Sequence, residues 1–163
     1  MTIFSNDTPA GQSLLDWWQE LQESPGERAE LRRAADLSAV IMTRSYQRLR
    51  WALLQQKDIK FKDEALACVA GLAARVKVSG QGHIAQDMGG SPPGKGGPRV
   101  SELRFKRLLA AKDRSEWYPL MRRTLSLLDD SADLMTLAEA AWWWNDTTRR
   151  NWANAYYPAF LNQ

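Results

Sequence analysis

The sequence predicts an all-α protein made of two small helical bundles packed together, with about seven to nine helices and no sheet. Apolar residues recur three and four positions apart through most of the 163 residues, which is the period of an amphipathic helix. No stretch shows the strict alternation of a half-buried strand. Helix breakers and capping residues divide the chain at intervals of helical length. We expect an N-terminal bundle over 1–78, a flexible Gly/Pro-rich loop over 79–98 and a C-terminal bundle over 99–163.

The N-terminal part begins with an apolar stripe of leucines and tryptophans after Ser13, which the Ser24-Pro25-Gly26 sequence stops. Asp36 or Ser38 can cap a later helix that reaches about Gln55. The expected helices lie over about 13–23, 27–35, 36–55 and 66–76. Gly71 interrupts the last of them. Because glycine inside a helix costs about 1 kcal/mol relative to alanine, we expect a close helix crossing there.

The segment 79–98 holds seven of the ten glycines and three of the seven prolines. Such a composition predicts a flexible loop, which can include a single turn around His83 to Met88. Within it, Gly89 to Lys95 fits the spacing of a phosphate-binding loop. However, Gly96 stands where Ser or Thr is needed, and two prolines remove backbone donors, so we reject a nucleotide site.

After Arg99 the helical period returns, with Phe105, Leu108 and Leu109 on one face. The expected caps of the following helices are Asp113 or Ser115, then Asp133, and finally Asp146 or Thr147.

The stretch from Arg99 to Arg123 concentrates positive charge. It contains eight Lys/Arg and three Asp/Glu, a local charge of +5, whereas the whole chain has +3 and the remainder −2. Its arginines fall on two consecutive helices that should pack antiparallel. Such a surface suits the phosphates of a nucleic-acid backbone, and nothing indicates base-specific recognition. Within the stretch we expect Lys106, Lys112 and Arg114 to be ordinary solvated charges.

Catalytic residues are scarce. His83 is the only histidine and Cys68 the only cysteine, and their positions do not suit a metal site or a nucleophilic pair. Asp129, Asp130 and Asp133 are interpreted as helix-terminus acids. We therefore expect no enzyme activity, no cofactor and no metal. With no apolar run of membrane-spanning length, no secretory signal and no possible intramolecular disulfide, a cytoplasmic location is the default.

Eight tryptophans are many for this length. Trp17 and Trp18 lie on an apolar stripe and should be core. Because successive helical residues turn by about 100°, Trp142, Trp143 and Trp144 cannot all face one core. At least one should meet a second layer, a partner or a base. This keeps open the alternative of a helical adaptor whose basic, Trp-rich face binds another protein.

Residues 99–157 resemble a known family. The pattern E-x-R-F-x-x-L-L, a joint, L-R-x-L-x-x-L-L, a tryptophan and W-A-x-x-Y is typical of CasB, the small subunit of the type I-E CRISPR complex Cascade. The residues that match it are Glu102, Arg104, Phe105, Leu108, Leu109, Arg122, Arg123, Leu125, Leu128, Trp144, Trp152, Ala153 and Tyr156.

The resemblance implies a non-catalytic protein of two helical bundles, present as two copies beside other Cascade subunits and CRISPR RNA. It would help hold the target and displaced DNA strands during R-loop formation. Matching positions imply nucleic-acid contacts by Arg33, Arg104, Arg123 and Arg149, with Lys60 and Lys62 near another such position. Clustering alone adds Arg99, Arg107 and Arg150.

Overall fold

The structure is a computed structural model that describes residues 1–80 and 82–163. The first half contains α1 (Pro9–Gln22), α2 (Pro25–Arg33), α3 (Leu37–Ile41), α4 (Arg44–Leu54), α5 (Asp63–Ala73) and β1 (Val78–Ser79). The second half contains α6 (Ile84–Gly89), α7 (Glu102–Ala110), α8 (Arg114–Leu127), β2 (Ser131–Ala132), α9 (Leu134–Trp143) and α10 (Asp146–Leu161).

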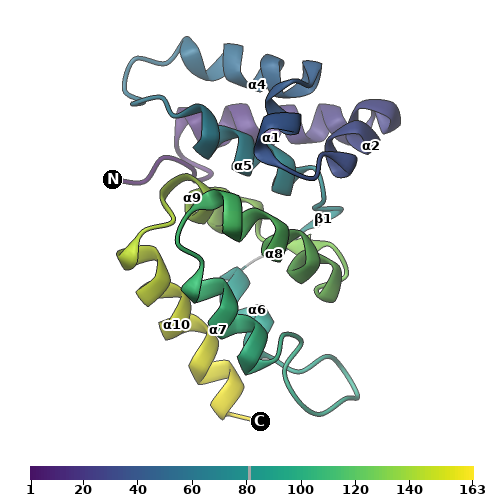
Figure 1. Cartoon of the computed structure of the whole chain (residues 1–163), viewed down its shortest axis with the longest axis vertical. Helices are drawn as coiled ribbons and strands as arrows, with labels where there is room; N and C mark the ends of the chain where they lie inside the picture. Colours follow the sequence, from purple (N-terminus) through teal and green to yellow (C-terminus); the bar gives the residue numbers. More distant parts are fainter. Residues whose placement is uncertain (81) are drawn as a thin grey trace.

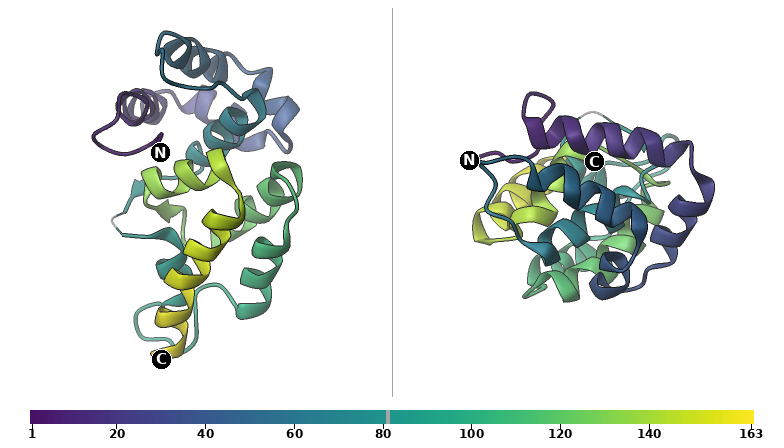
Figure 2. Two further views of the ribbon diagram at one scale, coloured as in Figure 1. Left: turned by 90° about the vertical axis from the view of Figure 1, so that its left-hand side faces the viewer. Right: turned by 90° about the horizontal axis from the view of Figure 1, so that it is seen from above.

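The helices are arranged in two tiers along the long axis of the molecule (Figure 1). One tier contains α1, α2, α4 and α5, and the other contains α6, α7, α8 and α10. Seen from the side, α10 runs down the second tier to the C-terminus (Figure 2). Helix α9 packs on α5, and the buried apolar side chains of both tiers belong to one continuous cluster. The described structure is thus predominantly helical, as the apolar period predicts.

The expectation of no sheet is wrong. β1 and β2 form a parallel pair in which Val78 faces Ser131 and Ser79 faces Ala132. The pairing continues at both ends, because the Lys77 N–H donates to the Asp130 carbonyl at 2.8 Å and the Gly80 N–H to the Ala132 carbonyl at 2.9 Å. Strands of two residues are too short to show an alternating pattern, so the sequence carries no signal for them.

The described residues form ten helices, more than the seven to nine expected. The helix expected from Asp36 to about Gln55 is divided into α3 and α4, because the Thr43 hydroxyl accepts the Tyr46 N–H and starts a new helix. The first helix also begins earlier than expected, since Thr8 caps it.

The segment 79–98 is not a loop throughout, because α6 lies where a single turn around His83 to Met88 was considered from the sequence. His83 caps α6 by accepting the Ala85 N–H at 3.0 Å, and Ile84, Ala85, Met88 and Gly89 are buried. A Cβ at Gly89 would lie 2.3 Å from the Tyr156 carbonyl oxygen, so glycine permits the close packing of α6 on α10. This packing is a tertiary effect that local composition does not reveal.

The tryptophans are mostly interior. Trp17 is buried and Trp18 is half-buried, in line with the core positions expected for them. Trp142 and Trp144 are both buried because the backbone turns at Trp144, where φ is +22°. Trp143 lies between the core and solvent and donates from Nε1 to Glu139 at 2.9 Å. The exposed tryptophan is Trp51 on α4, with 69% of its surface accessible, which was not expected from the sequence.

Candidate nucleic-acid interface

The two helices that carry the positive segment meet at a groove. Helix α7 starts at the Ser101 cap and buries Phe105 and Leu108, whereas Arg104 and Arg107 lie on its exposed side. The ring of Tyr156 on α10 stacks on the buried ring of Phe105, with their centroids 3.9 Å apart. The amphipathic pattern of α7 therefore sets which side its arginines occupy.

Helix α8 supplies the other wall. Asp113 caps it by accepting the Glu116 N–H at 3.0 Å, which confirms one of the two expected caps. Pro119 lies in its second turn and the helix continues through it. The inner side of α8 buries Trp117, Met121 and Leu125, which leaves Arg123 exposed on the outer side.

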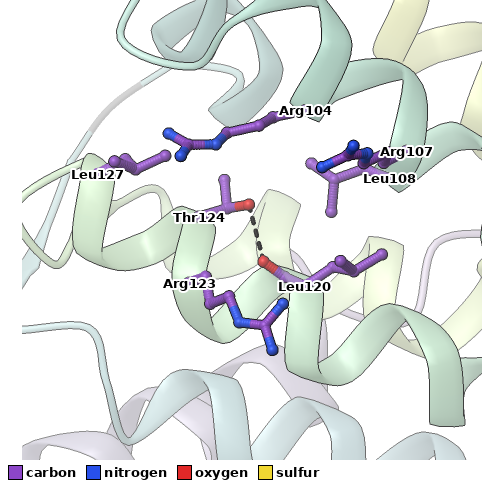
Figure 3. Close-up of a pocket in the computed structure, with 7 residues that line it drawn as sticks. All are labelled: Arg104, Arg107, Leu108, Leu120, Arg123, Thr124 and Leu127. Carbon is purple, nitrogen blue, oxygen red and sulfur yellow. Dashed lines mark hydrogen bonds between the residues drawn. The ribbon is translucent and has the colours of Figure 1, made fainter.

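A pocket of about 160 Å³ lies between α7 and α8. Figure 3 shows Arg104 reaching toward Leu127, Arg107 beside Leu108, and Arg123 extending along Leu120. The Thr124 hydroxyl is not free, because it donates to the Leu120 carbonyl at 2.8 Å. The pocket is lined by Arg104, Arg107, Leu108, Leu120, Arg123, Thr124 and Leu127.

The charged side chains that line the groove are all positive. Three guanidinium groups line it and no carboxylate does. Within 1–80 and 82–163, none of the three side chains takes part in an ion pair or a side-chain hydrogen bond. Their donors are available to an external anion, and a guanidinium can offer two parallel N–H groups to a phosphate. The structure thus brings together Arg104, Arg107 and Arg123 from the predicted set.

Of the other predicted residues of the C-terminal half, Arg149 and Arg150 are engaged within the chain, and Arg99 lies at a separate pocket. Arg149 donates to the Ala111 carbonyl at 2.8 Å, and its guanidinium lies 5.2 Å from the centre of the Trp144 ring. Arg150 pairs with Asp146 one turn earlier at 3.0 Å on an exposed surface. Arg99 lines a separate small pocket with Asp87, and its charge partly offsets the effect of burial, which raises the pKa of that carboxyl group.

In the N-terminal half the predicted residues are dispersed. Arg33 is exposed in the last turn of α2. Lys60 is exposed in the connection between α4 and α5, and Lys62 precedes α5 with its ammonium group 5.3 Å from the centre of the Trp143 ring. These three side chains lie on elements different from those of the groove.

Arg114 is not the solvated charge expected from the sequence. Its guanidinium donates to the Ala141 carbonyl at 2.8 Å and also to the Trp142 carbonyl, both at the C-terminal end of α9. The last carbonyls of a helix lack intrahelical partners, and an arginine from α8 satisfies two of them. Because the partners lie 27 and 28 positions away, no local pattern reveals this role.

The described residues offer little to a metal or a nucleophile. No group of three His, Cys, Asp or Glu side chains in 1–80 and 82–163 is placed to hold a metal ion. Cys68 is fully buried, and burial raises the pKa of its thiol well above the ordinary value. Asp133 caps α9, as expected, but Asp130 instead pairs with Arg32 from α2. No helix in this part of the chain is long and apolar enough to cross a membrane.

The fold and the groove define a small helical protein with an unpaired three-arginine surface. The family model of the CRISPR-associated protein Cse2 matches residues 27–157, and the chain belongs to this family. This confirms the CasB resemblance seen in the sequence, since Cse2 and CasB designate the same small-subunit family. None of the curated proteins is significantly similar to the chain.

One solved structure shares the fold. The chain matches a chain of E. coli Cascade bound to a PAM-containing double-stranded DNA target, with a 32-nucleotide spacer, solved at 3.20 Å. The TM-score is 0.70 at 18% sequence identity, and the match covers 91% of this chain and 97% of that one. At this identity the likeness concerns the fold.

Proposed function

We propose that the protein is a non-catalytic subunit of a cytoplasmic type I-E Cascade complex. In this role it holds the target and displaced DNA strands by backbone contacts while the R-loop is open. Its partners are the other Cascade subunits, CRISPR RNA and a second copy of itself. Family membership and the fold shared with a Cascade chain support the assembly. The observation that supports the DNA contact is the groove of Arg104, Arg107 and Arg123, which no carboxylate lines.

The free energy of R-loop formation is small enough for a few protein–DNA contacts to matter. R-loop formation exchanges one duplex for another of similar stability, so a few contacts to the backbone can shift its equilibrium. Unpaired guanidinium groups provide contacts that tolerate any sequence. A free subunit with a net charge of only +3 should bind DNA weakly. We infer that most of the affinity appears when its groove is continuous with neighbouring subunits.

The test is a charge-removed complex. Arg104→Gln combined with Arg123→Gln should weaken target-DNA binding by assembled Cascade. A plot of the logarithm of the binding constant against the logarithm of the salt concentration should also become less steep. Its negative slope should shrink in magnitude by about 2, because each lost phosphate contact removes about 0.9 from it. Lys106→Gln is the matched control. It removes one positive charge from the same helix, where Lys106 pairs with Glu102 at 3.7 Å on an exposed surface, and should leave affinity nearly unchanged.

Equal affinity and equal salt slope in the double variant and in wild type would refute the DNA contact.

One observation supports the alternative of a helical adaptor. Trp51 is exposed, and so are Met42 and Leu54, which lie nearby in sequence. Purification of the chain with its native partners distinguishes the two. Co-purifying RNA supports the Cascade role, and a protein complex without RNA supports the adaptor.

A further inference from the structure

A second cationic cluster lies where α2, the end of α5 and α8 meet. Two of its arginines are one turn apart on α2, one follows α5, and one is on α8, while a lysine just before β1 completes it. A single carboxylate, just before β2, lies among them. The cluster consists of Arg28, Arg32, Arg75, Lys77, Arg122 and Asp130.

Backbone carbonyls hold the arginines in place. The Arg32 carbonyl accepts from Arg122 at 2.7 Å and from Arg75 at 3.3 Å, and the Ala74 carbonyl accepts from Arg28 at 3.4 Å. These bonds orient the guanidinium groups but do not neutralise them. Residues from both tiers are therefore fixed at a shared junction.

Neutralising charge is in short supply at this junction. One oxygen of Asp130 lies 3.4 Å from Arg32 and 3.7 Å from Lys77, whereas Arg28, Arg75 and Arg122 form no ion pair among the described residues. Burial, together with neighbouring arginines, lowers the pKa of Arg28 and of Arg75. Repulsion among the guanidinium groups is therefore only partly compensated.

Several donors also remain unused. The Nη2 of Arg28, the Nε of Arg75 and the Nε of Arg122 are buried and have no hydrogen-bond partner among the described residues. One acceptor of the cluster, Asp130 Oδ1, is likewise buried without a partner, so the unused donors outnumber it by three to one. A buried donor left unpaired costs free energy, so each of these groups favours an added acceptor. The cluster is nevertheless open to solvent, since 54% of the Lys77 side chain and 29% of the Arg32 side chain are exposed.

We propose that this junction binds a phosphate group. A phosphate supplies more negative charge and several acceptor oxygens at once, at a cluster where five cations have a single carboxylate, and arginine forks match its geometry. The site is separate from the groove, which uses Arg104, Arg107 and Arg123. The inference does not depend on the proposed function, because the ligand is either free phosphate or a phosphate of a nucleic-acid backbone.

The first experiment uses inorganic phosphate and the full chain. Phosphate should raise the melting temperature more than sodium chloride at the same ionic strength. Arg28→Gln and Arg75→Gln should each weaken phosphate affinity by about tenfold, the effect of losing one hydrogen bond to a charged group. Lys95→Gln, which removes one exposed charge from the 90–98 loop, should leave the affinity unchanged.

Asp130→Asn tests whether removing the negative charge of the cluster strengthens phosphate binding. Its φ of +56° lies in the left-handed region, which asparagine tolerates well, so the backbone should be preserved. Removing the competing carboxylate should tighten phosphate binding several-fold. If the cluster serves only as an ion-pair contact between the tiers, Asp130→Asn lowers stability without improving phosphate binding, and the proposal fails. A wild-type response no larger than that to chloride also overturns it.

A second experiment distinguishes free phosphate from a phosphate of a nucleic-acid backbone. A single-stranded oligonucleotide is titrated against wild type, Arg75→Gln and the Arg104→Gln/Arg123→Gln variant. Parallel loss of phosphate and oligonucleotide affinity in Arg75→Gln assigns a backbone phosphate, and loss of phosphate affinity alone assigns a free phosphate. The groove variant should keep its phosphate response in either case, so failure of the groove and failure of the junction are distinguishable.

Discussion

The ring of Tyr118 occupies the space in which a Cβ at Gly71 would lie. That Cβ would be 2.5 Å from the Tyr118 hydroxyl oxygen and 2.7 Å from Cε1. The Tyr118 ring is held in place, because its hydroxyl group donates to the Ala34 carbonyl at 2.8 Å. Burial also raises the pKa of this hydroxyl to about 12. Gly71 thus permits α8 to cross α5 closely, which confirms the crossing expected at this glycine.

Gly71→Ala should destabilise the protein by about 1–3 kcal/mol, the usual effect of overpacking, although alanine favours a helix. Urea unfolding measures the change. Gly26→Ala is the matched control, since no atom lies within 4 Å of its added Cβ, and it should be neutral or stabilising by up to about 1 kcal/mol. In a Tyr118→Leu background the cost of Gly71→Ala should largely vanish. A persistent cost there would show that the ring is not its cause.

His83 should make stability depend on pH. Burial lowers the pKa of His83 in the folded chain, against weaker opposite effects of Asp133 and Asp87. The unfolded chain then binds the proton at higher pH, so stability should fall as pH decreases below about 6.5. Protonation also removes the Nδ1 acceptor that caps α6, and the loss should reach about 1 kcal/mol.

His83→Asn is the control for this pH effect, because asparagine caps a helix and does not titrate. Denaturation midpoints between pH 5 and 7 should be flat in His83→Asn and sloped in wild type. As the chain has one histidine, an equal slope in both proteins would contradict the assignment.

Arg149 and Arg150 should differ in their effect on stability. Arg149→Ala removes the bond to the Ala111 carbonyl and the contact with Trp144, so we expect a loss of about 1–2 kcal/mol. Arg150→Ala breaks only an exposed pair with Asp146 and should change stability by less than about 0.5 kcal/mol. Chemical unfolding of the two variants compares them directly. Similar losses in both would mean that the Ala111 bond is not important.

Glu139 should anchor the N-terminal segment to α9. Its carboxylate accepts the Phe4 N–H at 2.7 Å and the Ile3 N–H at 3.0 Å. Glu139→Ala removes charge-assisted bonds, so the free energy of unfolding should fall by about 2 kcal/mol. Hydrogen exchange at the amides of Ile3 and Phe4 should accelerate more than exchange within α4. Unchanged protection of these two amides would rule out the anchor.

Part of the candidate interface could be predicted because it is local. Arg104 and Arg107 are placed by the apolar period of α7, and Arg123 by that of α8, so charge counting and periodicity indicated a basic surface on these two helices. The groove between the helices was not predicted. The role of Arg114 was missed, because the carbonyls that it binds belong to α9. The junction of Arg28, Arg75 and Arg122 was missed for the same reason, since its members come from three separate elements.

The sequence by itself determined the helical class, the caps Asp36, Asp113 and Asp133, the crossing at Gly71 and the family. The cap expected at Asp146 or Thr147 is wrong, because Asn145 caps α10. These depend on residues within a few positions of each other, or on a motif that is contiguous. Only the tertiary structure decided which arginines remain free and which are held by helix ends. It also decided that β1 pairs with β2 and that α6 is buried. The physical reason is that the partners of these groups lie tens of residues away, where no local period can indicate them.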